Sequence, residues 1–131
     1  MRYKRPDSKN AISLMESSKK EMEFTLSLEV SENSGSTIIR NIYESLRMLG
    51  DALLVKRGIQ SKDHIEPINE LLKLKVNTTR SLNLIENLRI LRHNINYYGY
   101  SPNVEEVKDF LSFIKDNFKI IYNAVLKEIE K

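Results

Sequence analysis

The amino-acid sequence predicts an all-α fold, an antiparallel up-and-down bundle of four long helices plus one short helix. Apolar residues recur every three or four positions along most of the chain, the spacing that places them on one face of a helix. Only four glycines and three prolines occur in 131 residues, and most of them fall where segments should end. The composition, 40% hydrophobic and 30% charged, is typical of one globular domain, so we expect residues 1–131 to form a single unit.

The first helix is expected at residues 7–30. Asp7 or Ser8 can accept hydrogen bonds from the free N–H groups at its start. Apolar residues then follow at helical spacing and predict one buried stripe. Four residues near the end of the segment also fit a short strand, and this alternative stays open: Phe24, Thr25, Leu28 and Val30.

The second helix, expected at residues 36–58, has the strongest apolar pattern. Ser36 is its expected cap, and Gly58 is expected to end it in a left-handed turn. Gly50 lies inside this helix at a cost of about 1 kcal/mol relative to alanine. We therefore expect another backbone to approach closely at Gly50.

The third and fifth helices are placed by proline. A short helix is expected at residues 65–76, beginning near His64, because Pro67 is tolerated only in a first turn. The last helix is expected to open with Ser101 as its cap and Pro102 at its first position. Short connections between long helices favour antiparallel neighbours.

The fourth helix is expected at residues 79–97. Thr78 or Thr79 is the expected cap, and Gly99 is expected to close the helix in a left-handed conformation. Leucine and isoleucine recur along one stripe of this segment. The other sides of the helix are polar, and the candidate functional residues lie there.

Composition and missing motifs exclude several classes of protein. The absence of cysteine removes disulfides, zinc–thiolate sites and thiol catalysis. The sequence has no Glu-x-x-His pair, phosphate loop, dinucleotide fingerprint or nucleophile elbow, so we expect neither metal nor cofactor. No stretch approaches the roughly 18 apolar residues of a membrane span, and we expect a soluble, cytoplasmic protein that does not bind membranes. Only His64 and His93 can exchange protons near neutral pH.

The net charge of +3 is unevenly distributed. Residues 73–93 carry five basic side chains and one acidic side chain, whereas the flanking parts are close to balance. This excess is compatible with contacts to phosphate oxygens and equally with a solvated helix face. The sequence leaves both interpretations open.

A group of polar residues lies along the expected fourth helix. Arg89, Arg92, His93 and Asn96 lie at offsets of three, four and seven, so they are expected to share one side. Three tyrosines come at the end of this helix: Tyr97, Tyr98 and Tyr100. Their rings suit stacking on unpaired bases, although docking of a helix end on the bundle is the commoner role of such rings.

The second helix carries a matching polar stripe. Arg40, Glu44, Arg47 and Asp51 lie at offsets of four, seven and eleven. A solvated ladder of ion pairs is the more frequent outcome for such a run. A helix interface is the alternative, because exposed pairs contribute only a few tenths of a kcal/mol each.

Two runs resemble the HEPN domains, small helical bundles of which many are partners of minimal nucleotidyltransferases. Residues 39–47 read IRNIYESLR, and residues 88–99 read LRILRHNINYYG before a long final helix. The resemblance implies, in active members, a metal-independent ribonuclease. Its site is an arginine followed after four to six residues by a histidine, assembled across a homodimer interface.

This chain departs from the active pattern of the family. Four residues separate Arg92 from Tyr97, so tyrosine stands where the resemblance implies histidine. Tyrosine ordinarily has a pKa of about 10 and is a poor base at neutral pH, although it can donate a hydrogen bond to phosphate. The resemblance therefore implies a degenerate site at Arg92 and Tyr97, with Asn96 beside them.

The expected function is that of a noncatalytic homodimer, joined through the second and fourth helices, that binds RNA or a nucleotidyltransferase partner. Arg89, Arg92, Asn96 and Tyr97 would line its groove. The first alternative is an active ribonuclease toxin of a toxin–antitoxin pair, in which Arg89 or Arg92 stabilises phosphate charge and His93 moves protons. The second alternative is a structural bundle with no nucleic-acid role.

Overall fold

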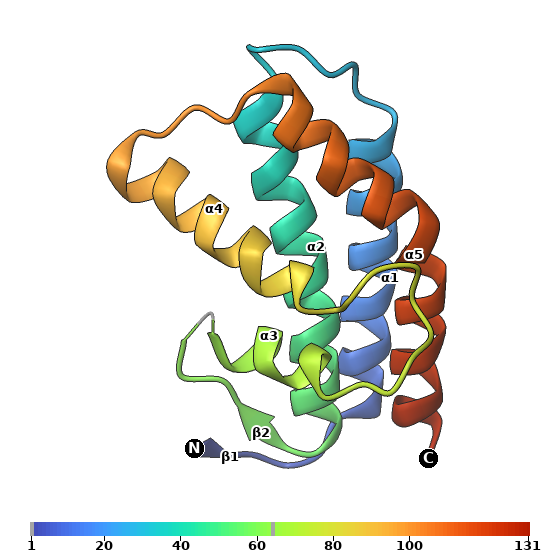
Figure 1. The fold of residues 1–131 in the computed structure, drawn as a ribbon. Coiled ribbons are helices and arrows are strands. Elements are labelled where there is room, and N and C mark those ends of the chain that lie inside the picture. The colour runs from blue at the N-terminus through green and yellow to red at the C-terminus, as the bar shows by residue number, and fades with distance from the viewer. Residues whose placement is uncertain (1, 64) are drawn as a thin grey trace.

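The computed structural model describes residues 2–63 and 65–131 and is mostly helical (Figure 1). This confirms the all-α class. The elements follow in the order β1 (Arg2–Tyr3), α1 (Ser8–Leu26), α2 (Gly35–Lys56), β2 (Ile59–Gln60), α3 (Ile65–Leu72), α4 (Leu84–Tyr98) and α5 (Val104–Glu130). The two short strands, which the apolar pattern does not predict, pair antiparallel with Tyr3 opposite Ile59.

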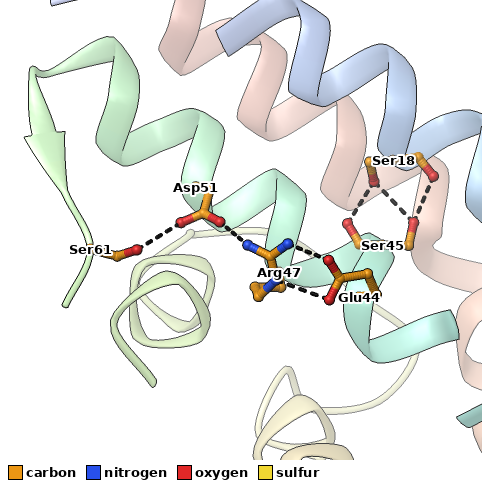
Figure 2. A network of polar contacts seen from close by, with 6 residues as sticks. All are labelled: Ser18, Glu44, Ser45, Arg47, Asp51 and Ser61. Carbon is orange, nitrogen blue, oxygen red and sulfur yellow. Dashed lines mark hydrogen bonds and ion pairs between the residues drawn. The ribbon is translucent and has the colours of Figure 1, made fainter. Parts of the chain in front are cut away.

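Helix α2 lies at the centre of the molecule. Helices α1 and α5 run along it, α3 packs against its C-terminal half, and α4 packs against it from another side (Figure 1). Twelve residues of α2 are buried, which explains why its apolar pattern is the strongest in the sequence. At its N-terminal half, Ser18 of α1 and Ser45 of α2 are fully buried, and each hydroxyl donates to the other residue's carbonyl oxygen, at 2.7 and 2.6 Å (Figure 2).

The glycines of α2 and its turn behave as expected. A Cβ atom on Gly50 would lie 2.0 Å from the carbonyl oxygen of Pro67, so the backbone of α3 does approach this position. Gly58 has a φ of 74° and turns the chain after α2 into β2. Gly99 has a φ of 66° and caps α4 in the left-handed conformation.

The start of α1 confirms one predicted cap, and the start of α2 corrects another. The Asp7 side chain accepts a hydrogen bond from the Asn10 backbone N–H, at 2.9 Å. Helix α2 begins at Gly35 and not after Ser36, because the Ser34 carbonyl already accepts the first helical bond from the Ile38 N–H, at 2.9 Å. Helix α1 ends at Leu26, and the four residues that also fitted a strand lie in the helix or in the following loop.

Helices α3 and α4 are both shorter than expected. Pro67 lies in the first turn of α3 as predicted, while His64 falls outside the described residues. Helix α3 ends at Leu72, and the chain then runs in non-helical conformation until Leu84. Thr79 does not cap α4, because a contact distant in sequence uses it: its N–H donates to the Asn117 side chain, at 2.8 Å.

The start of α5 corrects the predicted cap at Ser101. Helix α5 begins at Val104, and Asn103 caps it. The Asn103 side chain accepts from the Glu106 N–H at 2.8 Å, and the Glu106 carboxylate accepts from the Asn103 N–H at 3.2 Å. This reciprocal capping box satisfies two free donors, so it places the helix start two residues beyond the Ser101–Pro102 step.

Candidate nucleic-acid interface

The polar residues predicted on the second and fourth helices meet within one chain. Arg40 of α2 donates from Nε to Oδ1 of Asn96 on α4, at 2.7 Å. One turn earlier on α4, the guanidinium carbon of Arg92 lies 4.8 Å from the centroid of the Tyr43 ring. We call these four residues, together with Arg89, the α2–α4 cluster. These contacts join the polar side of α4 to α2, next to the apolar residues through which the two helices also pack.

Tyr43 is the centre of this cluster, and it is the residue to which the sequence analysis gave no role. Its side chain is 1% exposed. Burial raises the pKa of its phenol, although the positive charges of Arg92, Arg89 and Arg47 act in the opposite direction. Its position was readable in the sequence, because it lies three residues after Arg40 and four before Arg47, on the same side of the helix.

The predicted ion-pair ladder on α2 is present from Glu44 to Asp51 (Figure 2). The Arg47 guanidinium bonds to Glu44 on one side and to Asp51 on the other. Its hydrogen bonds to Glu44 raise the pKa of Arg47. Ser61, which follows β2, donates to Asp51 at 3.2 Å and extends the ladder to the next segment. The guanidinium of Arg47 is therefore paired within α2, whereas that of Arg40 bonds to Asn96 on α4.

The excess of positive charge in residues 73–93 is largely neutralised by local contacts. Three of its five cations form ion pairs: Lys73 with Glu70, Arg80 with Asp109, and Arg89 with Glu86. The hydrogen bond to Glu86 raises the pKa of Arg89. Within the part of the chain that the structure describes, Lys75 and Arg92 are the two members of this stretch that form no ion pair. Lys75 lies outside the cluster, so Arg92 is the cation of this stretch that the cluster contains without an ion pair. Arg40, the cluster's cation from α2, bonds to the neutral amide oxygen of Asn96.

The remaining predicted site residues on α4 contact one another through their rings. The His93 ring lies 4.6 Å from that of Tyr97 and 5.7 Å from that of Tyr98. Tyr97 is 68% and Tyr98 76% exposed, and Ile90, one turn before His93, is also exposed. We call Ile90, His93, Tyr97 and Tyr98 the aromatic stripe. Tyr100 is not part of it, because its hydroxyl bonds to Glu106 at the start of α5.

The predicted set thus divides into two neighbouring surfaces. Arg89, Arg92 and Asn96 belong to the α2–α4 cluster, whereas His93 and Tyr97 belong to the aromatic stripe. Arg92 and Tyr97 are five positions apart, which on a helix turns their side chains well away from each other. Arg92 and Tyr97 therefore do not form a compact pair within one chain.

Three further searches, for a metal site, for a membrane-spanning helix and for similar proteins, found no match among the described residues or for the sequence. The described residues contain no group of three or more His, Cys, Asp or Glu side chains arranged to hold a metal ion. None of the helices described here has the length and apolar character needed to span a bilayer. No family model matches the chain, and no characterised protein or solved structure is significantly similar to it.

Proposed function

We propose that this chain is a noncatalytic HEPN-like domain that binds RNA as a homodimer. Its fold is then an antiparallel up-and-down bundle of four long helices and a short one, with the dimer joined through α2 and α4. The observation that carries the proposal is the setting of Arg92. Its half-buried guanidinium lies over the Tyr43 ring next to exposed Asn96, and no carboxylate pairs with it among the described residues.

The chemistry of this surface suits single-stranded RNA. A guanidinium held over an aromatic ring keeps its donors in a fixed plane, and such a fork can bond two phosphate oxygens at once. The exposed rings of Tyr97 and Tyr98 offer faces on which unpaired bases can stack, at about 1–3 kcal/mol per base. A twofold axis next to α4 would double both features and lengthen the binding site.

The surroundings of His93 support a noncatalytic role. A general base acts on a proton within hydrogen-bond reach, and a third polar group often orients it. The ring of His93 packs on two tyrosine rings, and no carboxylate among the described residues bonds to it. In this proposal His93 supports the orientation of Tyr97 and Tyr98. A minimal nucleotidyltransferase is the partner protein that the resemblance implies for the same surface.

Fluorescence anisotropy with a labelled single-stranded RNA tests this function. We expect binding that weakens steeply as salt rises, because phosphate contacts release counterions. Arg92→Ala should weaken binding by about 5- to 10-fold and reduce the salt slope by about one ion. Lys19→Ala, an exposed cation on α1, is the matched control and should change neither quantity much. Binding that is absent at low salt would instead support the structural bundle.

The ribonuclease alternative has one observation in its favour, the exposed imidazole of His93 directly beside Arg92 in the sequence. Incubation of the purified chain with mixed RNA in the presence of a chelator separates the two functions. The proposal expects intact RNA from both the wild type and His93→Ala. Cleavage by the wild type that His93→Ala abolishes would replace it with the ribonuclease.

A further inference from the structure

A groove of about 750 Å³ lies far from the α2–α4 cluster, between the α3–α4 connection and the C-terminal turns of α5. Residues 73–83 form this connection, which leaves α3, reaches across to α5 and returns to α4 (Figure 1). Residues 74–77 form one wall of the groove, and α5 from Ile120 to Glu128, with Lys131 after its end, contributes the other. The proposed RNA-binding function uses no part of it.

Two neighbouring residues of the connection, Thr79 and Arg80, anchor it to α5. Asn117 is fully buried, accepts a hydrogen bond from the Thr79 N–H at 2.8 Å and donates to the Thr79 hydroxyl at 2.9 Å. Next to it, Arg80 pairs with both carboxylate oxygens of Asp109, at 2.8 and 3.2 Å. These bonds fix the connection beside α5, so the preceding residues 74–77 form a defined wall.

Residues 74–77 of this wall belong to neither a helix nor a strand, and no strand of the described chain pairs with them. Its side chains alternate between half-buried and exposed from Lys73 to Thr78, the period of a β-strand. Among the described residues, the backbone N–H and C=O groups of residues 75–77 make no hydrogen bond to another backbone group. An unpaired row of donors and acceptors is a template to which another extended chain can add.

The rim of the groove is strongly basic. Six cations line it against two carboxylates: Lys56, Arg57, Lys73, Lys75, Lys127 and Lys131, against Glu70 and Glu128. Glu70 forms ion pairs with both Lys73 and Arg57. Burial alone would raise the pKa of Glu70, but these hydrogen bonds outweigh it and lower the pKa. Lys75 and Lys127 both line the groove and form no ion pair within the described chain, so no carboxylate of that part compensates their charges.

The floor of the groove is aliphatic. Ile120 is 38% exposed there, with half-buried Leu74 and Val76 on the opposite wall. No lining residue is aromatic, so the groove lacks the stacking surfaces on which RNA-binding proteins hold bases. A ligand that matches it has negative charges along its edges, small apolar side chains and a backbone able to form hydrogen bonds.

We propose that this groove binds an extended acidic peptide segment of a partner protein, which adds as a strand beside residues 74–77. Its carboxylates would meet Lys75 and Lys127, its aliphatic side chains would cover Ile120, and its backbone would bond to that of residues 75–77. Main-chain pairing supplies affinity in this mode, and alternate side chains supply specificity. The partner thereby docks on a surface separate from the RNA-binding one.

A labelled octapeptide that alternates glutamate and valine tests the proposal by fluorescence anisotropy with the full chain. We expect saturable binding, weakened about tenfold by Lys75→Glu combined with Lys127→Glu. Lys19→Glu combined with Lys20→Glu, an equal charge change on α1, should leave the affinity nearly unchanged. Thermal unfolding of both double variants checks that they fold as the wild type does. Arg92→Ala should also leave peptide binding unchanged, whatever it does to RNA binding.

Two further probes identify the mode of binding. The same peptide with alternate backbone amides N-methylated keeps its charge and side chains but cannot pair as a strand, so it should bind about tenfold more weakly. Equal binding of the methylated peptide would overturn strand addition. No peptide binding at about 1 mM, binding that the lysine variants leave intact, or an RNA that displaces the peptide and depends on Lys75 and Lys127 would overturn the proposal.

Discussion

Replacing Gly50 with alanine is expected to destabilise the fold, even though alanine is the better helix former. Alanine would gain about 1 kcal/mol inside α2. Its Cβ atom, however, would lie 2.0 Å from the carbonyl oxygen and 2.8 Å from the Cα atom of Pro67. Both are backbone atoms, so α3 as a whole must move by more than 1 Å to reach ordinary van der Waals contact.

The size of the effect follows from what α3 buries. Overpacking a core costs about 1–3 kcal/mol. Complete detachment of α3 would also expose Ile68 and Leu71, both fully buried, at about 1.5–3 kcal/mol each. Subtracting the helix gain leaves up to about 2 kcal/mol from overpacking, and any loosening of α3 adds part of the burial cost. We therefore expect Gly50→Ala to lower the free energy of unfolding by about 2 kcal/mol or more.

Urea denaturation followed by circular dichroism measures this change. With an m-value of about 2 kcal/mol/M, the midpoint should fall by about 1 M. Gly35→Ala is the matched control, because its Cβ would meet a side-chain atom of Val107 at 3.2 Å, and we expect a change within about 1 kcal/mol. A Gly50→Ala chain as stable as the wild type would show that α3 does not dock on α2 at this position.

Two further substitutions test the contacts around the α3–α4 connection. Asn117→Ala should lower the free energy of unfolding by about 2–3 kcal/mol, because it leaves the Thr79 N–H without its buried acceptor, and an unchanged urea midpoint would contradict that bond. Glu70→Gln should cost about 1 kcal/mol at pH 7, since Arg57 and Lys73 remain partly solvated. The folded pKa of Glu70 is lowered, so this contribution is present above its unfolded value and disappears as the pH falls through the folded pKa. Wild-type and variant stabilities should therefore converge at low pH, and a difference that grows there would refute the assignment.

Local signals in the sequence predict the helical class and several of its turns. An isolated glycine within a strong helical pattern indicated the close approach at Gly50, and Gly58 and Gly99 indicated left-handed turns. The cap of α5 was also readable, since Asn103 precedes Glu106 by three residues as a capping box requires. Pro102 favours Ser101 as the cap, because proline is common at the first position of a helix. The reciprocal bonds between Asn103 and Glu106 nevertheless set the start of α5.

The spacing of residues along the sequence could not predict contacts between residues that are far apart in the chain. Helix α4 starts at Leu84 and not at Thr79, which bonds instead to Asn117, 38 residues further along the chain. Helical spacing placed Arg89, Arg92 and Asn96 on one side of α4, but the pairing of Asn96 with Arg40 depends on how two helices pack. Tyr97 was grouped with Arg92 through the family resemblance, whereas in the structure its ring packs against that of His93.

Chemical-shift mapping of RNA on the ¹⁵N-labelled chain tests RNA binding by α4 most directly. Titration of an unstructured RNA should shift the backbone amides of residues 90–98 and the side-chain Nε–H signal of Arg92. The amides of residues 73–77 in the groove should stay in place. Shifts confined to residues 73–77, or no shifts at about 1 mM RNA in low salt, would contradict an RNA-binding role for the α2–α4 cluster and the aromatic stripe.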